Sequence, residues 1–239
     1  MDYKEAIMNY GEDIKTGTPD SILASLFRTI LNDIGMDIYR FNSLLLKYLT
    51  RINTELNFRE IASIRGNLSN ELLRSVMTWK VFMKGLLFLN VQHFIILLTL
   101  ENDKGELSYH EYNVDMKEFS TVKKVDSINP DYILAKLFQQ IKMVLNIDDN
   151  LFNNLIVDYI RRVNIGIKDE EISSIKGNLK KELNRKHMTW RVFIKGLMFL
   201  NTHRFNIELK LLHSNNLYTT HYKSVVLNLK DDLEELTAG

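Results

Sequence analysis

Histidine and serine residues are the first candidates for chemistry in this chain. His110 and His221 are separated by 111 residues, and Ser63 and Ser174 have the same separation. A serine beside a histidine is typical of nucleophilic catalysis, but neither serine lies in a nucleophile elbow and no orienting acid stands at a recognisable spacing. A histidine on an expected strand without a second ligand nearby also makes a poor metal site. We therefore predict a non-enzymatic protein with no catalytic residue, metal site, cofactor or small-molecule substrate.

Basic residues recur at the same 111-residue spacing and are a stronger functional signal. Lys80 and Lys84 are four residues apart, which places them on one helix face, opposite Trp79. A basic surface present twice can contact a phosphate backbone or an acidic partner, and the alternative is a solvated helix face with local ion pairs. The candidate basic binding face comprises Arg51, Arg65, Arg74, Lys80 and Lys84, with Arg162, Lys176, Arg185, Arg191 and Lys195 at the matched positions.

A glycine–asparagine pair, Gly66-Asn67, recurs as Gly177-Asn178 ahead of an expected short helix. Backbone N–H groups at a helix start that follows glycine can bind phosphate. The flanking residues match neither a Walker loop nor a dinucleotide fingerprint, since both need further glycines at fixed spacing. We therefore expect a turn with an asparagine helix cap at both places.

These recurrences belong to one long internal repeat. Thr18-Pro19-Asp20 returns as Asn129-Pro130-Asp131, and the phrase Met77-Thr78-Trp79-Lys80-Val81-Phe82 returns at 188–193. At this offset residues 19–114 align with 130–225 without a gap, and about four positions in ten are identical, which predicts a tandem duplication. The predicted organisation is an N-terminal segment (1–18), repeat domain 1 (19–115), a linker (116–129), repeat domain 2 (130–227) and a C-terminal tail (228–239).

Each repeat is predicted to fold as α+β, with about four helices followed by a β-hairpin. Thr18 or Asn129 can cap the first helix, which then starts at proline. After Asn90 the apolar period changes from 3.6 to 2, which is typical of a strand with one buried face. The expected elements of the first repeat are helices from Pro19, after Asp37, up to Arg74 and over Trp79–Leu89, then strands over 94–100 and 107–114 around a turn at Asn102-Asp103-Lys104-Gly105.

The fourth helix carries a large apolar stripe. Trp79, Phe82, Leu86 and Leu89 fall on one face, and the matched helix around Trp190 repeats the pattern. Such a stripe indicates a core helix rather than a ligand site. We expect the two tryptophans to be buried at equivalent positions.

The strand after that helix differs between the repeats. Ile95 and Leu97 occupy positions where the second repeat has Asn206 and Glu208. Because a sheet with one buried face is polar on the other, the aliphatic pair indicates a face that something covers. Ile95 and Leu97 are therefore the candidate protein-contact face, covered by the other domain or by a partner chain, whereas Asn206 and Glu208 are expected to be more exposed.

The composition excludes several classes of protein. A chain of 239 residues that is 45% hydrophobic and 26% charged is not disordered or fibrous, and the absence of cysteine excludes disulfides and thiolate sites. No apolar run is long enough for a membrane span and no secretion signal is recognisable, so we expect no membrane partner. Residues 1–115 carry 12 basic and 15 acidic side chains, against 19 and 15 in residues 116–239. This charge split suits head-to-tail contact within or between chains.

Two phrases resemble known viral proteins. Arg65-Gly66-Asn67-Leu68 and Met77-Thr78-Trp79-Lys80-Val81-Phe82, followed by Lys84-Gly85-Leu86, resemble small proteins of tailed bacteriophages related to the T4-like myoviruses. The resemblance covers each repeat from about Pro19 to Val114 and implies a viral, non-enzymatic protein. Within one helix, Gly35-Met36-Asp37 with Phe41-Asn42 and Leu44-Leu45 looks like a stretch of a small phage protein that binds double-stranded DNA.

Two functions follow from these observations. The first is a structural or assembly component of a phage particle that bridges similar protein surfaces, with other phage structural proteins or itself as partners. Its location is then the host cytoplasm during infection, and the virion. The second is a double-stranded DNA-binding regulator whose paired helical units present matched basic faces to duplex DNA, since helices followed by a hairpin can form a winged helix.

Overall fold

The computed structural model describes residues 19–52, 57–102, 104–116, 119, 129–163, 166–200, 202–213 and 216–228. Over these residues the fold is α+β, as predicted, and each half of the chain supplies helices and then two strands. The first half contains α2 (Pro19–Asp33), α3 (Ile38–Ile52), α4 (Phe58–Leu73), α5 (Trp79–Phe88), β1 (Val91–Asn102) and β2 (Leu107–Asp115). The second half contains α7 (Asp131–Val144), α8 (Asp149–Val163), α9 (Asp169–Leu183), α10 (Trp190–Phe199), β3 (Thr202–His213) and β4 (Asn216–Asn228). The predicted segments at both termini and most of the predicted linker lie outside the described residues.

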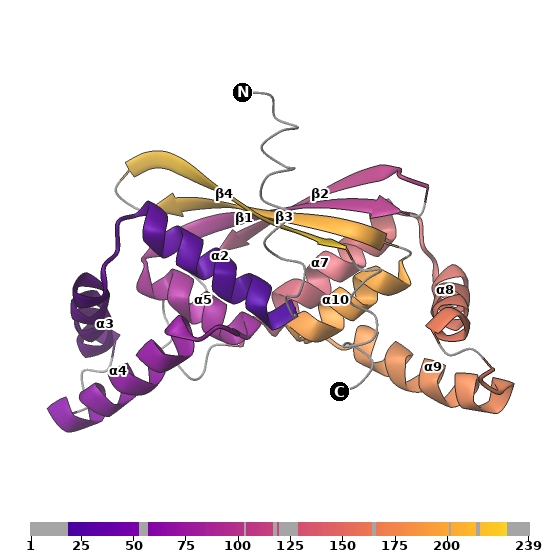
Figure 1. Ribbon diagram of the computed structural model, residues 1–239, viewed down its shortest axis with the longest axis horizontal. Coiled ribbons are helices and arrows are strands. Elements are labelled where there is room, and N and C mark those ends of the chain that lie inside the picture. Colours follow the sequence, from indigo (N-terminus) through magenta and orange to yellow (C-terminus); the bar gives the residue numbers. More distant parts are fainter. Residues whose placement is uncertain are drawn as a thin grey trace.

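All four strands form one antiparallel sheet in the order β2-β1-β3-β4. The helices lie on one side of this sheet, and no helix or strand of the described residues lies over its other side (Figure 1). The repeat predicted the two hairpins in separate domains, but β1 and β3 join them at the centre. A two-stranded hairpin alone is marginally stable, and the joining also removes two unpaired strand edges.

The pairing of β1 with β3 is self-complementary. Leu97 lies opposite Glu208, and Ile95 and Thr99 on β1 lie opposite Lys210 and Asn206 on β3. Leu97 and Glu208 are themselves equivalent under the 111-residue offset, and so are Ile95 with Asn206 and Thr99 with Lys210. A pseudo-twofold axis therefore passes between the two central strands at Leu97 and Glu208, as in the isologous interface of a symmetric dimer.

The tryptophans meet on this axis. Trp79 and Trp190 begin α5 and α10, each is 2% exposed, and their rings stack with centroids 6.1 Å apart and planes at 14°. The Trp79 Nε1–H also donates a hydrogen bond of 3.1 Å to the carbonyl oxygen of Pro130 in the other half. A single hydrophobic cluster includes buried residues of both halves. The prediction that both tryptophans are buried is confirmed, and each one is part of the contact between the halves.

The strand and turn predictions for the first hairpin are confirmed. Every second residue from Phe94 to Leu100 is buried, which is the predicted alternation. At the hairpin turn the Asn102 Oδ1 accepts hydrogen bonds from the backbone N–H groups of Lys104 and Glu106, at 3.0 and 2.9 Å. Gly105 adopts a φ of 77°, a left-handed conformation that glycine reaches without strain.

The third helix of each half is longer than predicted, and the expected turns at the glycine–asparagine pairs are wrong. Gly66 and Asn67 lie within α4, and Gly177 and Asn178 lie within α9. A capping box starts α4 instead, in which the Asn57 side chain accepts from the Glu60 N–H and the Glu60 carboxylate accepts from the Asn57 N–H. A capped start outweighs one interior glycine, which costs about 1 kcal/mol relative to alanine.

Side-chain caps start two other helices, and one predicted helix start is shifted. Asp37 accepts from the Arg40 N–H at 2.8 Å ahead of α3, and Thr78 accepts from the Val81 N–H at 3.4 Å ahead of α5. In the second half α7 begins one residue later than expected, so that Pro130 is its N-cap residue rather than its first residue. The predicted cap Thr18 lies outside the described residues.

One glycine in each half permits close packing of helices. A Cβ on Gly85 of α5 would lie 2.5 Å from Cε2 of Phe27 on α2, and a Cβ on Gly196 would lie 2.6 Å from Cε2 of Phe138 on α7. Both phenylalanines are fully buried and have no space into which to move. The two halves therefore depend on the same glycine contact.

We predict that Gly85→Ala lowers the free energy of unfolding by about 1–3 kcal/mol, because the added methyl group overpacks a filled core. Gly66→Ala is the matched control: nothing lies within 4 Å of its added Cβ, and its φ is helical, so stability should rise by up to about 1 kcal/mol. Urea denaturation measures both values. A Gly85→Ala protein as stable as the wild type would contradict the close approach.

Candidate interaction surfaces

The predicted basic residues of the two fourth helices differ in exposure, since Lys84 is buried and Arg191 is exposed. Lys84 of α5 is only 7% exposed, and its Nζ lies 3.9 Å from Glu71 Oε2 of α4. Its counterpart Lys195 on α10 is half-buried. The expectation of one exposed face opposite Trp79 is wrong here, because α5 contacts α2, α3, α4 and β1 and is covered on nearly all sides.

Lys80 and Arg191 lie at the contact between the halves. The Arg191 Nε–H donates a hydrogen bond of 2.9 Å to Oδ2 of Asp20, which starts α2 of the first half. At the matched place in the second half, burial raises the pKa of the Asp131 carboxyl, and the positive charges of His187 and Lys80 oppose part of that rise. These two basic residues therefore contribute to the electrostatics of the junction.

The aspartates were visible in the sequence but their role was missed. Asp20 and Asp131 follow the two prolines, and the sequence analysis used them only as part of a helix start. Their backbone carbonyl oxygens also accept hydrogen bonds from the N–H groups of Met77 and Met188, at 2.9 and 3.0 Å. The Pro-Asp phrase that both halves share pointed to these two aspartates. Only the folded structure shows which residues of the other half lie beside them.

Arg51 and Arg162 remain exposed, at opposite ends of the molecule. Each lies in the last turn of its helix, α3 or α8, where a positive charge also favours the helix dipole. Arg51 lies over the ring of Tyr48 with 5.8 Å from Cζ to the ring centroid, and Arg162 lies over Tyr159 at 5.6 Å. Each tyrosine packs edge-on against Phe88 or its matched residue in α10. Burial raises the pKa of both phenols, and the adjacent arginine partly opposes the rise.

The other four candidates are divided between the halves. Arg65 and Lys176 are half-buried on α4 and α9, whereas Arg74 and Arg185 are exposed just after those helices. Because Lys84 is buried and the exposed Arg191 is paired with Asp20, the ten predicted residues do not form one continuous surface. They are two matched sets at separate places.

The candidate protein-contact face lies on the uncovered side of the sheet. Ile95 and Leu97 are half-buried, and their strand neighbours include Lys210 and Glu208 of the other half. The described residues of the other half therefore flank this face edge-on, as β3, and none of their helices or strands lies over it, unlike one of the two predicted coverings. Cover by a partner chain stays a prediction. The exposure predicted for Asn206 and Glu208 concerns side chains outside the described ones.

The histidine and serine candidates are not brought together. His110 is buried on β2, its Nε2 lies 3.1 Å from Ser108 Oγ and its Nδ1 has no hydrogen-bond partner, whereas Ser63 is exposed on α4. His110 lies opposite Leu98, but His221 lies opposite Lys210 because an irregularity shifts the β3–β4 register. Across the described residues, no three histidine or carboxylate side chains gather as a metal site.

Comparisons with known proteins add no assignment. No protein family, curated protein or solved structure matches this chain. Among the helices of the described residues, none combines the length and apolar character that crossing a bilayer requires.

We predict that His110 makes the protein less stable below neutral pH. Burial lowers the pKa of its imidazole, so the unfolded chain binds the proton more readily than the folded one. Its contribution is complete above the unfolded pKa of about 6.5 and is lost as pH falls from there toward the folded pKa. Unfolding free energies of wild type and His110→Leu between pH 8 and pH 5 should differ in slope, with a shallower fall for the variant. Identical slopes would contradict this account.

Proposed function

We propose that the protein is a non-enzymatic binding component that bridges two similar protein surfaces, one at each end of its sheet. The observation that carries the proposal is the matched pair of exposed arginines, Arg51 over Tyr48 and Arg162 over Tyr159. They lie on α3 and α8, which are at opposite ends of the long axis (Figure 1). The protein thus has the same arginine–tyrosine surface twice, once at each end.

The arginine–tyrosine arrangement suits recognition of carboxylates. A guanidinium held over an aromatic ring loses less side-chain freedom on binding, and its planar donors match a carboxylate in two hydrogen bonds. The tyrosine rings are themselves fixed, since each packs against a phenylalanine of the core. The expected partner therefore presents an acidic group at each of two similar sites.

The resemblance to small proteins of T4-like bacteriophages supports a setting for this activity. We propose that the two halves arose by tandem duplication and that the protein is a structural or assembly component of a phage particle. Its partners are then other phage structural proteins or further copies of itself, in the host cytoplasm during infection and in the virion. Repeated surfaces are common in such assemblies, and a two-ended protein can bridge neighbouring ones.

Binding to duplex DNA is the second candidate, and the exposed Arg74 and Arg185 favour it. These residues occupy matched positions after α4 and α9, as contacts to two stretches of backbone would require. The candidate has less support than bridging, because Lys84 is buried and Arg191 is paired with Asp20.

The test is the stoichiometry of the complex that the tagged full chain forms in infected cells. We expect native mass spectrometry to find two partner copies on the wild type, one on Arg51→Gln or Arg162→Gln, and none on the double variant. Loss of one charged contact should weaken each site by about tenfold or more. Lys104→Gln, at the exposed hairpin turn, is the charge-matched control and should keep both copies.

Two results would overturn bridging. One is a single partner copy on the wild type that stays bound in both arginine variants and in the double variant. The other is tight binding to duplex DNA that weakens steeply with salt and is lost in Arg74→Gln with Arg185→Gln, which would establish the second candidate instead.

A further inference from the structure

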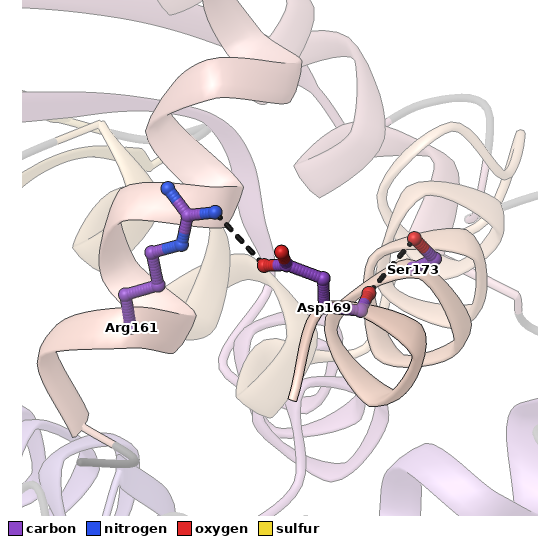
Figure 2. A network of polar contacts seen from close by, with 3 residues as sticks. All are labelled: Arg161, Asp169 and Ser173. Carbon is purple, nitrogen blue, oxygen red and sulfur yellow. Dashed lines mark hydrogen bonds and ion pairs between the residues drawn. The ribbon is translucent and has the colours of Figure 1, made fainter. Parts of the chain in front are cut away.

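The helix pairs at the two ends of the molecule differ at their tips. In the second half, Arg161 Nη2 near the end of α8 lies 3.0 Å from Asp169 Oδ1 at the start of α9. Ser173 Oγ donates a hydrogen bond of 3.0 Å to the Asp169 carbonyl oxygen, and Figure 2 shows the three residues in sequence across the tip. Polar contacts thus occupy this end of the α8–α9 pair.

The first half has Thr50, Phe58 and Ala62 at these three positions. The ion pair is therefore absent there, and Phe58, the first residue of α4, is 72% exposed. The next residue is the exposed Arg59, where the second half has Glu170. We call Phe58 and Arg59 the tip. The first half therefore exposes a phenyl group and a positive charge at the two positions where the second half has Asp169 and Glu170.

A second unmatched apolar surface lies in the other half. Met143 and Val144 end α7 and Leu151 lies in the first turn of α8, and they are 76%, 56% and 45% exposed. We call these three residues the corner. The first half has Asn32, Asp33 and Arg40 at the matched positions.

The corner has an acidic border. Asp148 precedes α8 and Asp149 is its first residue, and both are exposed. The Nζ of the buried Lys142 lies 3.6 Å from Asp149 Oδ1. The negative charge of this border is opposite to the positive charge of Arg59. Methionine and leucine side chains also pack well against a phenyl ring.

We infer that the tip of one copy docks on the corner of a second copy, so that the protein associates head to tail. Apolar groups meet apolar groups, and Arg59 approaches the carboxylates of Asp148 and Asp149. Within the described residues each chain has one tip and one corner, which a repeating heterologous contact requires. The inference goes beyond the proposed bridging function, since it uses residues that differ between the halves.

The placement of the two surfaces determines the form of the assembly. The α3–α4 pair lies at one end of the long axis and α8 lies at the other (Figure 1). The tip therefore does not reach the corner of its own chain, and we expect the contact to repeat from copy to copy as an open row. A closed dimer would instead require two tip–corner contacts between antiparallel copies. Both surfaces are small, so association is weak and depends on concentration.

Sedimentation equilibrium of the full chain tests the inference. The weight-average mass should rise with concentration from 28.1 kDa past the dimer value without a plateau. The tip variant Phe58→Asp with Arg59→Glu should stay monomeric, and so should the corner variant Met143→Asn with Val144→Asp. Each change installs the residues that the other half carries at the matched positions, so the fold already accommodates them.

Mixing the two variants gives the sharpest result. The tip variant keeps an intact corner and the corner variant keeps an intact tip, so the mixture should form 1:1 dimers and stop there. Lys104→Gln, at the exposed hairpin turn, is the control and should associate like the wild type. The tip and corner variants keep Arg51 and Arg162, so their loss of association separates this test from that of bridging. A wild type that stays monomeric at every concentration, or a mixture that does not pair, would overturn the inference.

Discussion

The antiparallel pairing of β1 with β3 is the interaction on which the rest of the structure depends. Each hairpin alone would leave two strand edges unpaired, and the central pairing removes one from each. Its register is centred on Leu97 and Glu208, and this fixes a pseudo-twofold axis for the whole molecule. The stacked Trp79 and Trp190 lie on the helical side of the same axis and continue the contact into the core.

This axis places one of the basic residues at the junction. Because α10 lies at the centre, Arg191 meets the carboxylate of Asp20 in the other half, whereas Lys84 is buried by elements of its own half. Arg51 and Arg162 stay outside, because α3 and α8 are at the two ends of the sheet (Figure 1). The strand pairing thus places Arg191 at the junction and Arg51 and Arg162 at the ends of the molecule, where a partner can reach them.

The sequence predicted the elements well and their assembly poorly. Local signals are short-ranged, so the helices after Asp37 and from Trp79 and the alternation from Phe94 to Leu100 were predicted correctly. Gly66 was misplaced in a turn because its residue type was weighed above the capping box that starts nine residues earlier, at Asn57. The β1–β3 pairing joins residues more than a hundred positions apart, and no local pattern specifies it. The exposed arginines were found among the candidates, but the internal ones could be separated from them only in three dimensions.

Native-state hydrogen exchange tests most directly whether the two halves are one cooperative unit. Leu86→Ala truncates a fully buried side chain of α5 in the first half, which costs about 2–5 kcal/mol. If the halves open together through the central pairing, the slowest amides of α10 and β3 should lose protection by the same factor as those of α5 and β1. Unchanged protection in α10 and β3, with loss confined to the first half, would show two independent units and contradict the account.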